Sequence, residues 1–489
     1  MCGHAVRAGA AKQAAWLVRY HVRMSGIEQN AGRPESRAGV YWLFALATIG
    51  AALGNLSQTG LNAMLPSTMA ELGVGVEVGQ WLTTGYMLVL GVAVPIATFL
   101  MRKLDDRRYL VLSYSLFVAG SLIDFVAPEF WSMLVGRILQ AVSVGLLIPK
   151  MQTIAMTKFP QGRQATAMGI AGIALGFAPS IGPTVGGGLD YSFGWRSFFL
   201  VLLVLSAVML VLVFLLVKRS DADADASAQF ETLSFILSTL GFGGVLLGLS
   251  QASSYGFASL WVWAPVAVGV VCLILFVRRQ LRIDQPLMDM AIFKSRTFVD
   301  ALLASVFLFA SYMGVTLIIP LFVQDLQGGT SLDTGLVTLP TVFTAVLVNP
   351  LSGILADKTS PRLAALIFGT FLVTGSVLSM TVDEGTPLWL LSVYQTLRAI
   401  GVSGLIGPLT TFSLSKLERP LVPHGSSTTV IARQVAATFG TAIMVFCVAA
   451  LAPLALTGDI AAAIPYQAAF AFSALMAILS MLLIVTRVK

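Results

Sequence analysis

Long apolar segments recur along this chain from about residue 39 to residue 486. There are fourteen of them, each of about 18–25 residues with few or no charges, and a helix of that length crosses a bilayer. Charged residues make up only 11% of the 489 residues and hydrophobic residues 57%, a balance that no water-soluble surface allows. The pattern predicts an all-α integral membrane protein. The expected spans are 39–62, 79–100, 109–127, 130–150, 164–188, 194–217, 231–251, 258–278, 298–322, 332–356, 363–382, 386–408, 424–452 and 465–486.

Lys and Arg residues are concentrated in alternate connections between these segments. One set of connections is basic, whereas the other carries mainly Asp and Glu. Basic loops stay in the cytoplasm because they are hard to translocate. We therefore expect an even number of crossings of a bacterial plasma membrane, with both termini in the cytoplasm. The basic connections lie at 102–108, 150–163, 218–219, 278–296, 358–362 and 416–419.

Other functional classes find little support in the sequence. The formal net charge of +7 is spread over many loops, so we expect contact with membrane lipids and no nucleic acid. Cys2, Cys272, Cys447 and the three histidines are too dispersed for a disulfide framework or a metal site. No nucleophile, base and orienting group recur on one loop, so we expect no enzyme. We also expect no cofactor, with the proton motive force as the energy source.

The first 38 residues are expected to form a cytoplasmic tail. They contain several basic residues but no apolar core of signal-peptide length, so we expect no cleavage. Met24 begins a more ordinary polar stretch, and we expect translation to start there.

The spans group as six, two and six. The expected domains are a first six-helix bundle at 39–217, a linker at 218–297 with two additional spans, and a second six-helix bundle at 298–486. A faint internal repeat relates the two groups of six. Duplicated bundles related by an axis along the membrane normal place a transport pathway between them. The repeat matches Leu100, Lys103 and Arg107 with Leu355, Lys358 and Arg362, at identical spacing.

Short motifs in order along the spans give the chain a family resemblance. From about residue 40 to residue 486, the sequence resembles the major facilitator superfamily. Within it, the fourteen-span drug:proton antiporters (EmrB/QacA type) and the lincomycin-resistance-type exporters are the most similar. The motifs are Ser57-Gln-Thr-Gly-Leu-Asn62, Gln80-Trp81-Leu-Thr-Thr-Gly-Tyr86, Gly136-Arg137-Ile-Leu-Gln140, Ala178-Pro-Ser-Ile-Gly182-Pro183-Thr-Val-Gly186-Gly187, Asp357-Lys358 and Arg433-Gln434.

Small residues in the fifth span are candidates for a conformational hinge. In lipid, they allow close approach between helices, and ordinary tight packing is the alternative interpretation. The resemblance implies an antiporter signature whose bending governs alternating access. The hinge residues are Gly176, Gly182, Pro183, Gly186 and Gly187.

Arg137, Arg398 and Arg433 lie within predicted spans. A guanidinium near mid-membrane costs at least about 2.5–3.5 kcal/mol, so each should face a partner or a cavity. All three are candidates for the proton or substrate pathway. The alternative is a purely structural role, in which each arginine holds carbonyls or a Gln of a neighbouring helix. The resemblance implies a role in proton transfer for Arg137. Lys150, near the inner end of the fourth span, is expected to snorkel to the cytoplasmic interface.

The inner loop after the second span of each bundle is expected to clamp the bundles in one conformation. The resemblance implies a Gly-x-x-x-Asp pattern there. The first copy departs from it, with Thr98 for Gly and Arg102 for Asp, whereas the second copy keeps Gly353 and Asp357. The clamp residues are Arg102, Arg107, Asp357, Lys358 and Arg362.

No residue in the sequence matches the carboxylate that is expected to bind the proton. The resemblance implies a carboxylate in the first span, but that region offers only amides and hydroxyls. Asp124 and Asp300 are the candidate carriers, although a solvated interfacial Asp is the preferred interpretation of both. A core with three arginines and no certain acid favours neutral or anionic amphiphiles as substrates.

Polar and aromatic residues on otherwise apolar spans are candidates for the substrate cavity. An apolar pocket with a few polar anchors is typical of a broad-range binder. The candidates are Gln58, Asn62, Trp81, Tyr86, Gln140, Gln152, Asn349, Gln395 and Gln434.

The sequence as a whole predicts a monomeric transporter that exports small amphiphilic substrates, such as antibiotics, in exchange for protons by alternating access. One alternative is an exporter of an endogenous metabolite or peptide. The other is a transporter-like sensor or assembly protein without proton flux, which the missing acid and the altered first loop keep open.

Overall fold

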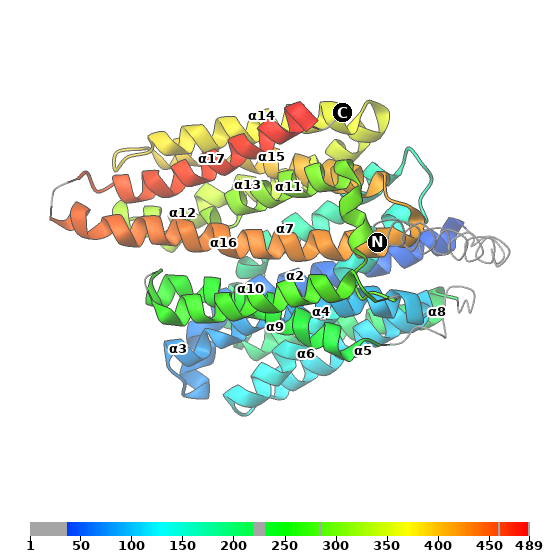
Figure 1. Ribbon diagram of the computed structural model, residues 1–489. Coiled ribbons are helices and arrows are strands. Elements are labelled where there is room, and N and C mark those ends of the chain that lie inside the picture. The colour runs from blue at the N-terminus through cyan, green and yellow to red at the C-terminus, as the bar shows by residue number, and fades with distance from the viewer. Residues whose placement is uncertain (1–36, 219–229, 258, 284, 458–459, 488–489) are drawn as a thin grey trace, which may run out of the picture.

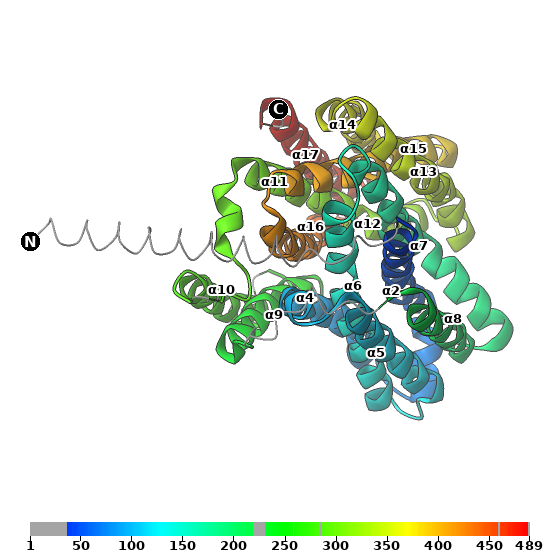
Figure 2. The ribbon, with the colours of Figure 1, turned by 90° about the vertical axis from the view of Figure 1, so that its right-hand side faces the viewer.

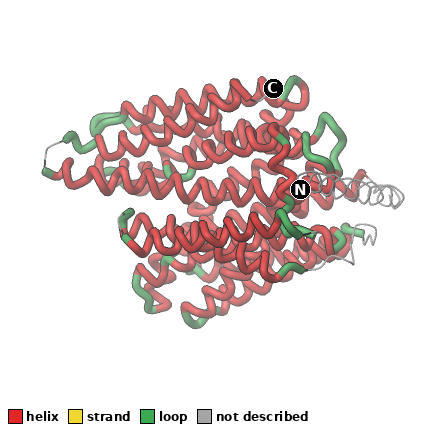
Figure 3. The backbone as a smooth tube through the Cα atoms, viewed as in Figure 1, coloured by secondary structure: helices red, strands yellow, loops and turns green. Residues whose placement is uncertain are grey.

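The computed structural model describes residues 37–218, 230–257, 259–283, 285–457 and 460–487. In these ranges the chain is helical, with short connections and no strand (Figure 3). Fourteen helical segments of the described residues are long and apolar enough to cross a membrane, which confirms the predicted all-α fold. The predictions for the tail and for Met24 concern residues 1–36, which lie outside the described residues.

The first bundle contains six long helices and one short outer helix. Within it, α2 packs on α7, and α6 packs on both α4 and α5. The elements are α2 (Arg37–Leu72), α3 (Val76–Gly79), α4 (Trp81–Lys103), α5 (Asp106–Val126), α6 (Phe130–Thr157), α7 (Gln164–Phe193) and α8 (Arg196–Leu216).

The second bundle repeats this arrangement, with one interruption. Its first crossing is formed by α11, α12 and a π-helical turn η3, which together replace the single expected helix at 298–322. The elements are η2 (Met290–Lys294), α11 (Arg296–Tyr312), α12 (Val315–Leu321), η3 (Phe322–Leu326), α13 (Ser331–Lys358), α14 (Pro361–Leu378), η4 (Ser379–Thr381), α15 (Leu388–Ser415), η5 (Arg419–Leu421), α16 (Val422–Leu456) and α17 (Ile464–Arg487).

Two further helices, α9 (Thr232–Tyr255) and α10 (Leu260–Gln280), form a tightly packed pair. Glycines permit this closeness, because a Cβ on Gly244 would lie 2.7 Å from the carbonyl oxygen of Pro265. The pair lies beside the junction of the two bundles, where α9 contacts both α4 and α16 (Figure 2).

Basic residues mark one end of the helices. Arg102 and Lys103 occupy the last turn of α4, Arg279 the last turn of α10 and Lys358 the last turn of α13. Cations in these positions complement the partial negative charge of a helix C-terminus. We call this the basic end, which is the right-hand end in Figure 1, and the opposite end, which carries α3, the acidic end.

Several helices continue beyond the predicted spans. α2 ends at Leu72 instead of residue 62, α6 at Thr157 instead of residue 150, and α15 at Ser415 instead of residue 408. Hydropathy detects only the apolar part of a helix that lies in the lipid. The helical hydrogen bonds of the backbone continue into polar sequence until a residue that ends the helix. The extension of α6 carries Thr153, which donates to Ser426 of the other bundle, and the extension of α15 carries the buried Thr411.

Candidate functional site

Arg137 is the centre of a buried polar cluster in the first bundle. Its Nη1 group donates to Ser57 Oγ at 2.6 Å and to Gln140 Oε1 at 2.9 Å, and its Nε donates to the Leu82 carbonyl at 3.3 Å. The guanidinium carbon lies 4.2 Å from the ring centroid of Tyr86. These contacts join α6 to α2 and α4.

Gln140 extends this cluster to α5. Its amide nitrogen donates to Ser121 Oγ at 2.9 Å, and its Oε1 also accepts from Ser57 Oγ at 2.8 Å. Four helices of the first bundle therefore meet through one connected set of polar side chains. Ser57 and Gln140 belong to the motifs in the sequence, but Ser121 was not predicted.

Asp124 lies in the same region, fully buried on α5. Among the described residues, neither of its carboxyl oxygens has a hydrogen-bond partner, and the Nη2 group of Arg137 also lacks one. Gly136 makes room for Asp124, because a Cβ on Gly136 would lie 2.1 Å from Asp124 Oδ1. A buried carboxyl without hydrogen-bond partners is costly in its ionised form, so this site favours the neutral carboxyl. The predicted interfacial, solvated position of Asp124 is wrong.

Arg398 forms a corresponding cluster in the second bundle. Its guanidinium donates to Gln395 Oε1 at 2.9 Å, to Ser376 Oγ at 3.1 Å and to the Ser311 carbonyl at 3.0 Å. Gln395 in turn donates to Ser379 Oγ at 3.2 Å. All of these partners are neutral, so this cluster holds one arginine without an acid.

The internal repeat aligns the two clusters. Gln395 follows Gln140 by 255 residues, the interval that separates Lys358 from Lys103 and also Ser376 from Ser121. Asp124 is matched by Ser379 at the same interval. The two arginines are not equivalent, because Arg137 precedes its Gln by three residues and Arg398 follows its Gln by three. At this position of the repeat, the first bundle therefore has a carboxyl and the second a hydroxyl.

Arg433 lies on α16 and is also buried. It donates to Thr410 Oγ1 at 2.7 Å and to Ser305 Oγ at 3.3 Å, and its guanidinium carbon lies 5.1 Å from the Phe309 ring centroid. Within the described part of the chain its Nε has no partner. These contacts join α16 to α11 and α15 inside the second bundle, through hydroxyls in place of the carbonyls or Gln that the structural interpretation expects.

Asp357 joins the two bundles at the basic end. Its carboxylate accepts hydrogen bonds from the backbone N–H groups of Ala165 at 3.1 Å and Thr166 at 2.7 Å, and from the Thr166 hydroxyl at 2.6 Å. α7 begins at Gln164, so Asp357 caps the N-terminus of a helix in the other bundle. This is the geometry that a clamp between bundles needs.

The first copy of the loop makes a different junction. Thr98, which stands where the family pattern has Gly, donates to Ser427 Oγ of α16 at 2.7 Å. Thr153 on α6 donates to Ser426 Oγ at 3.3 Å. Hydroxyl pairs therefore link the two bundles on this side of the basic end, where Arg102 lies in the last turn of α4.

Arg107 and Arg362 make matching contacts within their own bundles. Arg107 Nη2 donates to the Phe214 carbonyl of α8 at 3.0 Å, and Arg362 Nη2 donates to the Val485 carbonyl of α17 at 3.3 Å. Each arginine bonds to the last helix of its own bundle, so neither makes the contact between bundles that was predicted for it. Lys358 is exposed beside Asp357.

α7 changes partners along its length. Near its start, a Cβ on Gly169 would lie 2.4 Å from the Asn349 carbonyl oxygen of α13, in the other bundle. Farther along, Cβ atoms on Gly182 and Gly186 would lie 2.1 Å from Thr59 Oγ1 and 2.4 Å from the Gly60 oxygen, both on α2. The predicted hinge residues thus form the segment where α7 passes from a contact between bundles to one within a bundle. α7 nevertheless remains one helix through Pro179 and Pro183.

The predicted cavity residues separate into two groups. Tyr86, Gln140 and Gln395 are buried inside the bundles, tied to neighbouring helices. Gln152 and Asn349 are buried as well, each with a side-chain oxygen that has no partner in the described ranges. Asn349 faces α7 of the other bundle, because a Cβ on Gly172 would lie 2.5 Å from its Oδ1. The assignment of all nine residues to one substrate cavity therefore stays a prediction. The residues that keep exposed or partly exposed surface are Gln58, Asn62, Trp81 and Gln434.

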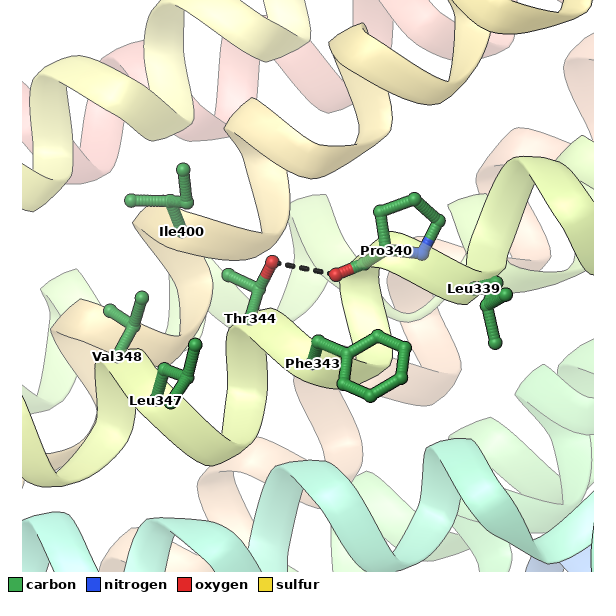
Figure 4. A pocket seen from close by; sticks show the side chains of 7 residues that line it. All are labelled: Leu339, Pro340, Phe343, Thr344, Leu347, Val348 and Ile400. Carbon is green, nitrogen blue, oxygen red and sulfur yellow. Dashed lines mark hydrogen bonds between the residues drawn. The ribbon is translucent and has the colours of Figure 1, made fainter.

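A groove of about 400 Å³ lies between α13 and α15 (Figure 4). Its lining is apolar, and the one hydroxyl, Thr344 Oγ1, already donates to the Pro340 carbonyl at 2.8 Å. Phe343 and Leu347 stand largely exposed beside it. A substrate site needs convergent polar groups, so this groove is better suited to lipid chains.

Comparison with known proteins identifies the family. A family model described as Major Facilitator Superfamily matches residues 47–441. The chain belongs to the major facilitator superfamily. Like other members, it is a membrane transporter rather than an enzyme, and the predicted resemblance is confirmed.

Two curated relatives and one solved structure illustrate this membership. The uncharacterized MFS-type transporter YcnB of Bacillus subtilis is 35% identical over 443 residues, 90% of this chain and 93% of that protein. The lincomycin resistance protein LmrB of Bacillus subtilis is 34% identical over 405 residues, 81% of this chain and 83% of that protein. The crystal structure of the human organic anion transporter MFSD10 shares the fold, with a TM-score of 0.64 at 14% identity over 91% of this chain and 99% of that chain.

Proposed function

We propose that this transporter, acting as a monomer, exports small amphiphilic molecules, such as antibiotics, across the plasma membrane in exchange for protons. The observation that carries the proposal is the buried, unpartnered carboxyl of Asp124 in the same bundle region as the buried guanidinium of Arg137. The relative named lincomycin resistance protein supports the substrate class. The distribution of Lys and Arg supports a cytoplasmic location for the basic end and both termini.

Asp124 is the proposed proton carrier. The neutral, protonated carboxyl is compatible with a site that offers no hydrogen bonds, whereas an ionised one is costly there. Loss of the proton creates a negative charge that attracts Arg137. That attraction competes with the hydrogen bonds that Arg137 makes to Ser57 on α2.

Ser57 connects the proton site to the surface of α2. Gln58, the next residue, is partly exposed, and Asn62 is exposed one turn farther along the helix. A change in the Arg137–Ser57 bond therefore acts on the helix that presents polar groups outside the bundle core. Proton and substrate would bias the same element, which is the condition for coupling between two sites.

Contacts between the bundles at the basic end support the assignment of this conformation as outward-facing. The hydrogen bonds of Asp357 and Thr98 between bundles lie at the basic end, and the later part of α7 packs within its own bundle. Rocking of the bundles would break these hydrogen bonds and open the basic end to the cytoplasm.

Neutral or anionic amphiphiles are the proposed substrates. Asp124 is enclosed within one bundle, so it does not offer its carboxylate to a cation in the space between bundles. Arg137, Arg398 and Arg433 add positive charge to the core. Strong efflux of the cationic dye ethidium that survives Asp124→Asn would contradict this assignment.

Drug accumulation tests the proposal. In a drug-sensitive bacterium without its own exporters, expression of the transporter should lower accumulation of lincosamides or macrolides, and a protonophore should abolish the effect. Asp124→Asn should behave like the protonophore, whereas Asp300→Asn should not. Unchanged accumulation of every compound, with the protein present in the membrane, would refute the proposal.

A further inference from the structure

A second groove, of about 450 Å³, opens at the basic end between α5 and α8. It combines basic and apolar side chains, unlike the groove between α13 and α15. It lies outside the bundle core and away from Asp124, so the transport cycle described above does not use it. Its lining consists of Arg107, Arg108, Val111, Leu112, Ser115 and Phe214.

Two guanidinium groups stand at the mouth of the groove. Arg107 uses Nη2 to bond the Phe214 carbonyl, and its guanidinium carbon lies 5.4 Å from the Phe214 ring centroid. Arg108 uses Nε in an ion pair with Asp105 at 3.3 Å, and its side chain is 47% exposed. A guanidinium carries five N–H groups, so these contacts leave donors on both residues for a phosphate.

The local charge around the mouth is positive. Asp106 is paired with both Lys150 and Lys158, at 2.5 Å each. Asp105 is paired with Arg108, so the two arginines that line the groove are accompanied by one paired acid. None of the lining residues is an acid that would hold the ammonium of a zwitterionic headgroup.

The wall of the groove suits an acyl chain. Leu112 and Phe214 are partly or largely exposed, and Ser115 lies seven residues beyond Arg108 on α5. Seven residues of α-helix rise about 10 Å, so the groove runs from the level of a headgroup into the upper hydrocarbon region. A soluble phosphate would use the arginines but not this wall.

We propose that this groove binds one anionic diacyl phospholipid. Its phosphate lies on Arg107 and Arg108, and one acyl chain follows Leu112 and Ser115 past Phe214. Basic pockets between helices at the cytoplasmic surface are typical sites for anionic headgroups. Such a lipid would bridge α5 and α8, two helices that pack on each other in the first bundle.

The second bundle supplies a matched control. Arg362 is the counterpart of Arg107 and makes the same kind of bond to the end of α17. The counterpart of Arg108 is Leu363, which is an exposed apolar residue. The equivalent place in the second bundle therefore has one arginine, whereas the groove has two. Arg362→Gln removes one positive charge at the same end of the protein but outside the groove.

Native mass spectrometry of protein released from nanodiscs with equal phosphatidylglycerol and phosphatidylcholine tests the proposal. The wild type should retain one phosphatidylglycerol. Arg108→Gln should lower retention about fivefold, the effect of removing one basic residue near a membrane surface. Ser115→Trp should lower retention by filling the groove with both arginines present, and Arg362→Gln should leave it unchanged. Equal retention of both lipids by the wild type, or undiminished phosphatidylglycerol in folded Arg108→Gln and Ser115→Trp, would overturn the assignment.

Discussion

At the scale of single residues, the same type of side chain has different surroundings in the two bundles. Arg137 and Arg398 both reach a Gln and serine hydroxyls, but only the first bundle places an acid, Asp124, where its repeat has Ser379. Neutral partners accept the hydrogen bonds of a guanidinium, but they do not change charge when a proton binds or leaves. In the proposed mechanism, proton coupling therefore belongs to the first bundle and Arg398 has a structural role.

The first prediction compares Ser57→Ala with Ser376→Ala. Each substitution removes a buried hydrogen bond to an arginine, and Ser57→Ala also removes the bond from Ser57 to Gln140. Each lost bond should lower the free energy of unfolding by about 1 kcal/mol. Only Ser57→Ala should also alter the dependence of transport on pH, because only Arg137 shares its region with an acid. Thermal unfolding in detergent and transport assays across a pH series measure the two effects. Identical pH profiles in the two variants would contradict the distinction.

Arg137, Gln140 and Asp357 could be selected from the sequence by residue type and by their order along the chain. The side chains that surround them could not be predicted in this way. Lys150 was expected to snorkel, yet it is buried against Asp106 at 2.5 Å. That partner lies 44 residues earlier, on a neighbouring helix, and spacing along one helix does not reveal it. Gln140 was assigned to a cavity for the same reason, because the facing side of α5 was not known.

At the scale of elements, α7 and α13 form the closest junction between the bundles. Gly169 and Gly353 allow backbone contact there, since a Cβ on Gly353 would lie 2.3 Å from the Ala165 carbonyl oxygen. Backbone atoms cannot move aside as a flexible side chain can. The junction therefore tolerates few changes while the basic end is closed.

The second prediction concerns Gly169→Ala. Its Cβ would lie 2.4 Å from the Asn349 carbonyl oxygen, so it should destabilise the closed basic end by about 1–3 kcal/mol, the usual range for overpacking. Alkylation of a cysteine at Thr411, buried in the wild type, should become faster in a background without other cysteines. Gly188→Ala is the control, because no atom lies within 4 Å of its Cβ position. Equal alkylation rates in both variants would argue against this junction as the seal.

The third prediction concerns the Asp357 clamp. Asp357→Asn removes the negative charge from the N-terminus of α7 and weakens the bonds to Ala165 and Thr166. The equilibrium between outward-facing and inward-facing states should shift about 5–150-fold toward the inward-facing state, as expected for a coupling energy of a few kcal/mol. Spin-label distances across the basic end should lengthen, while Lys358→Gln should leave them unchanged. Unchanged distances in Asp357→Asn would remove the clamp from the mechanism.

At the scale of the whole molecule, hydropathy and loop charge predicted the number of crossings. They could do so because each crossing needs an apolar helix long enough to span the same bilayer. They did not predict that α9 contacts both bundles, or that the crossing at Arg296–Leu326 is interrupted. Those features depend on which helix faces which, and lipid-facing and protein-facing apolar surfaces look alike in sequence. The position of Asp124 inside a bundle is a further example.

The central claim is that Asp124 carries the exchanged proton, and proteoliposomes with an internal pH dye test it most directly. Addition of a transported lincosamide or macrolide to wild-type vesicles should produce a proton flux. Asp124→Asn should abolish the flux while the folded protein still binds the compound, and Asp300→Asn should retain it. A wild-type flux that persists undiminished in Asp124→Asn would contradict the account.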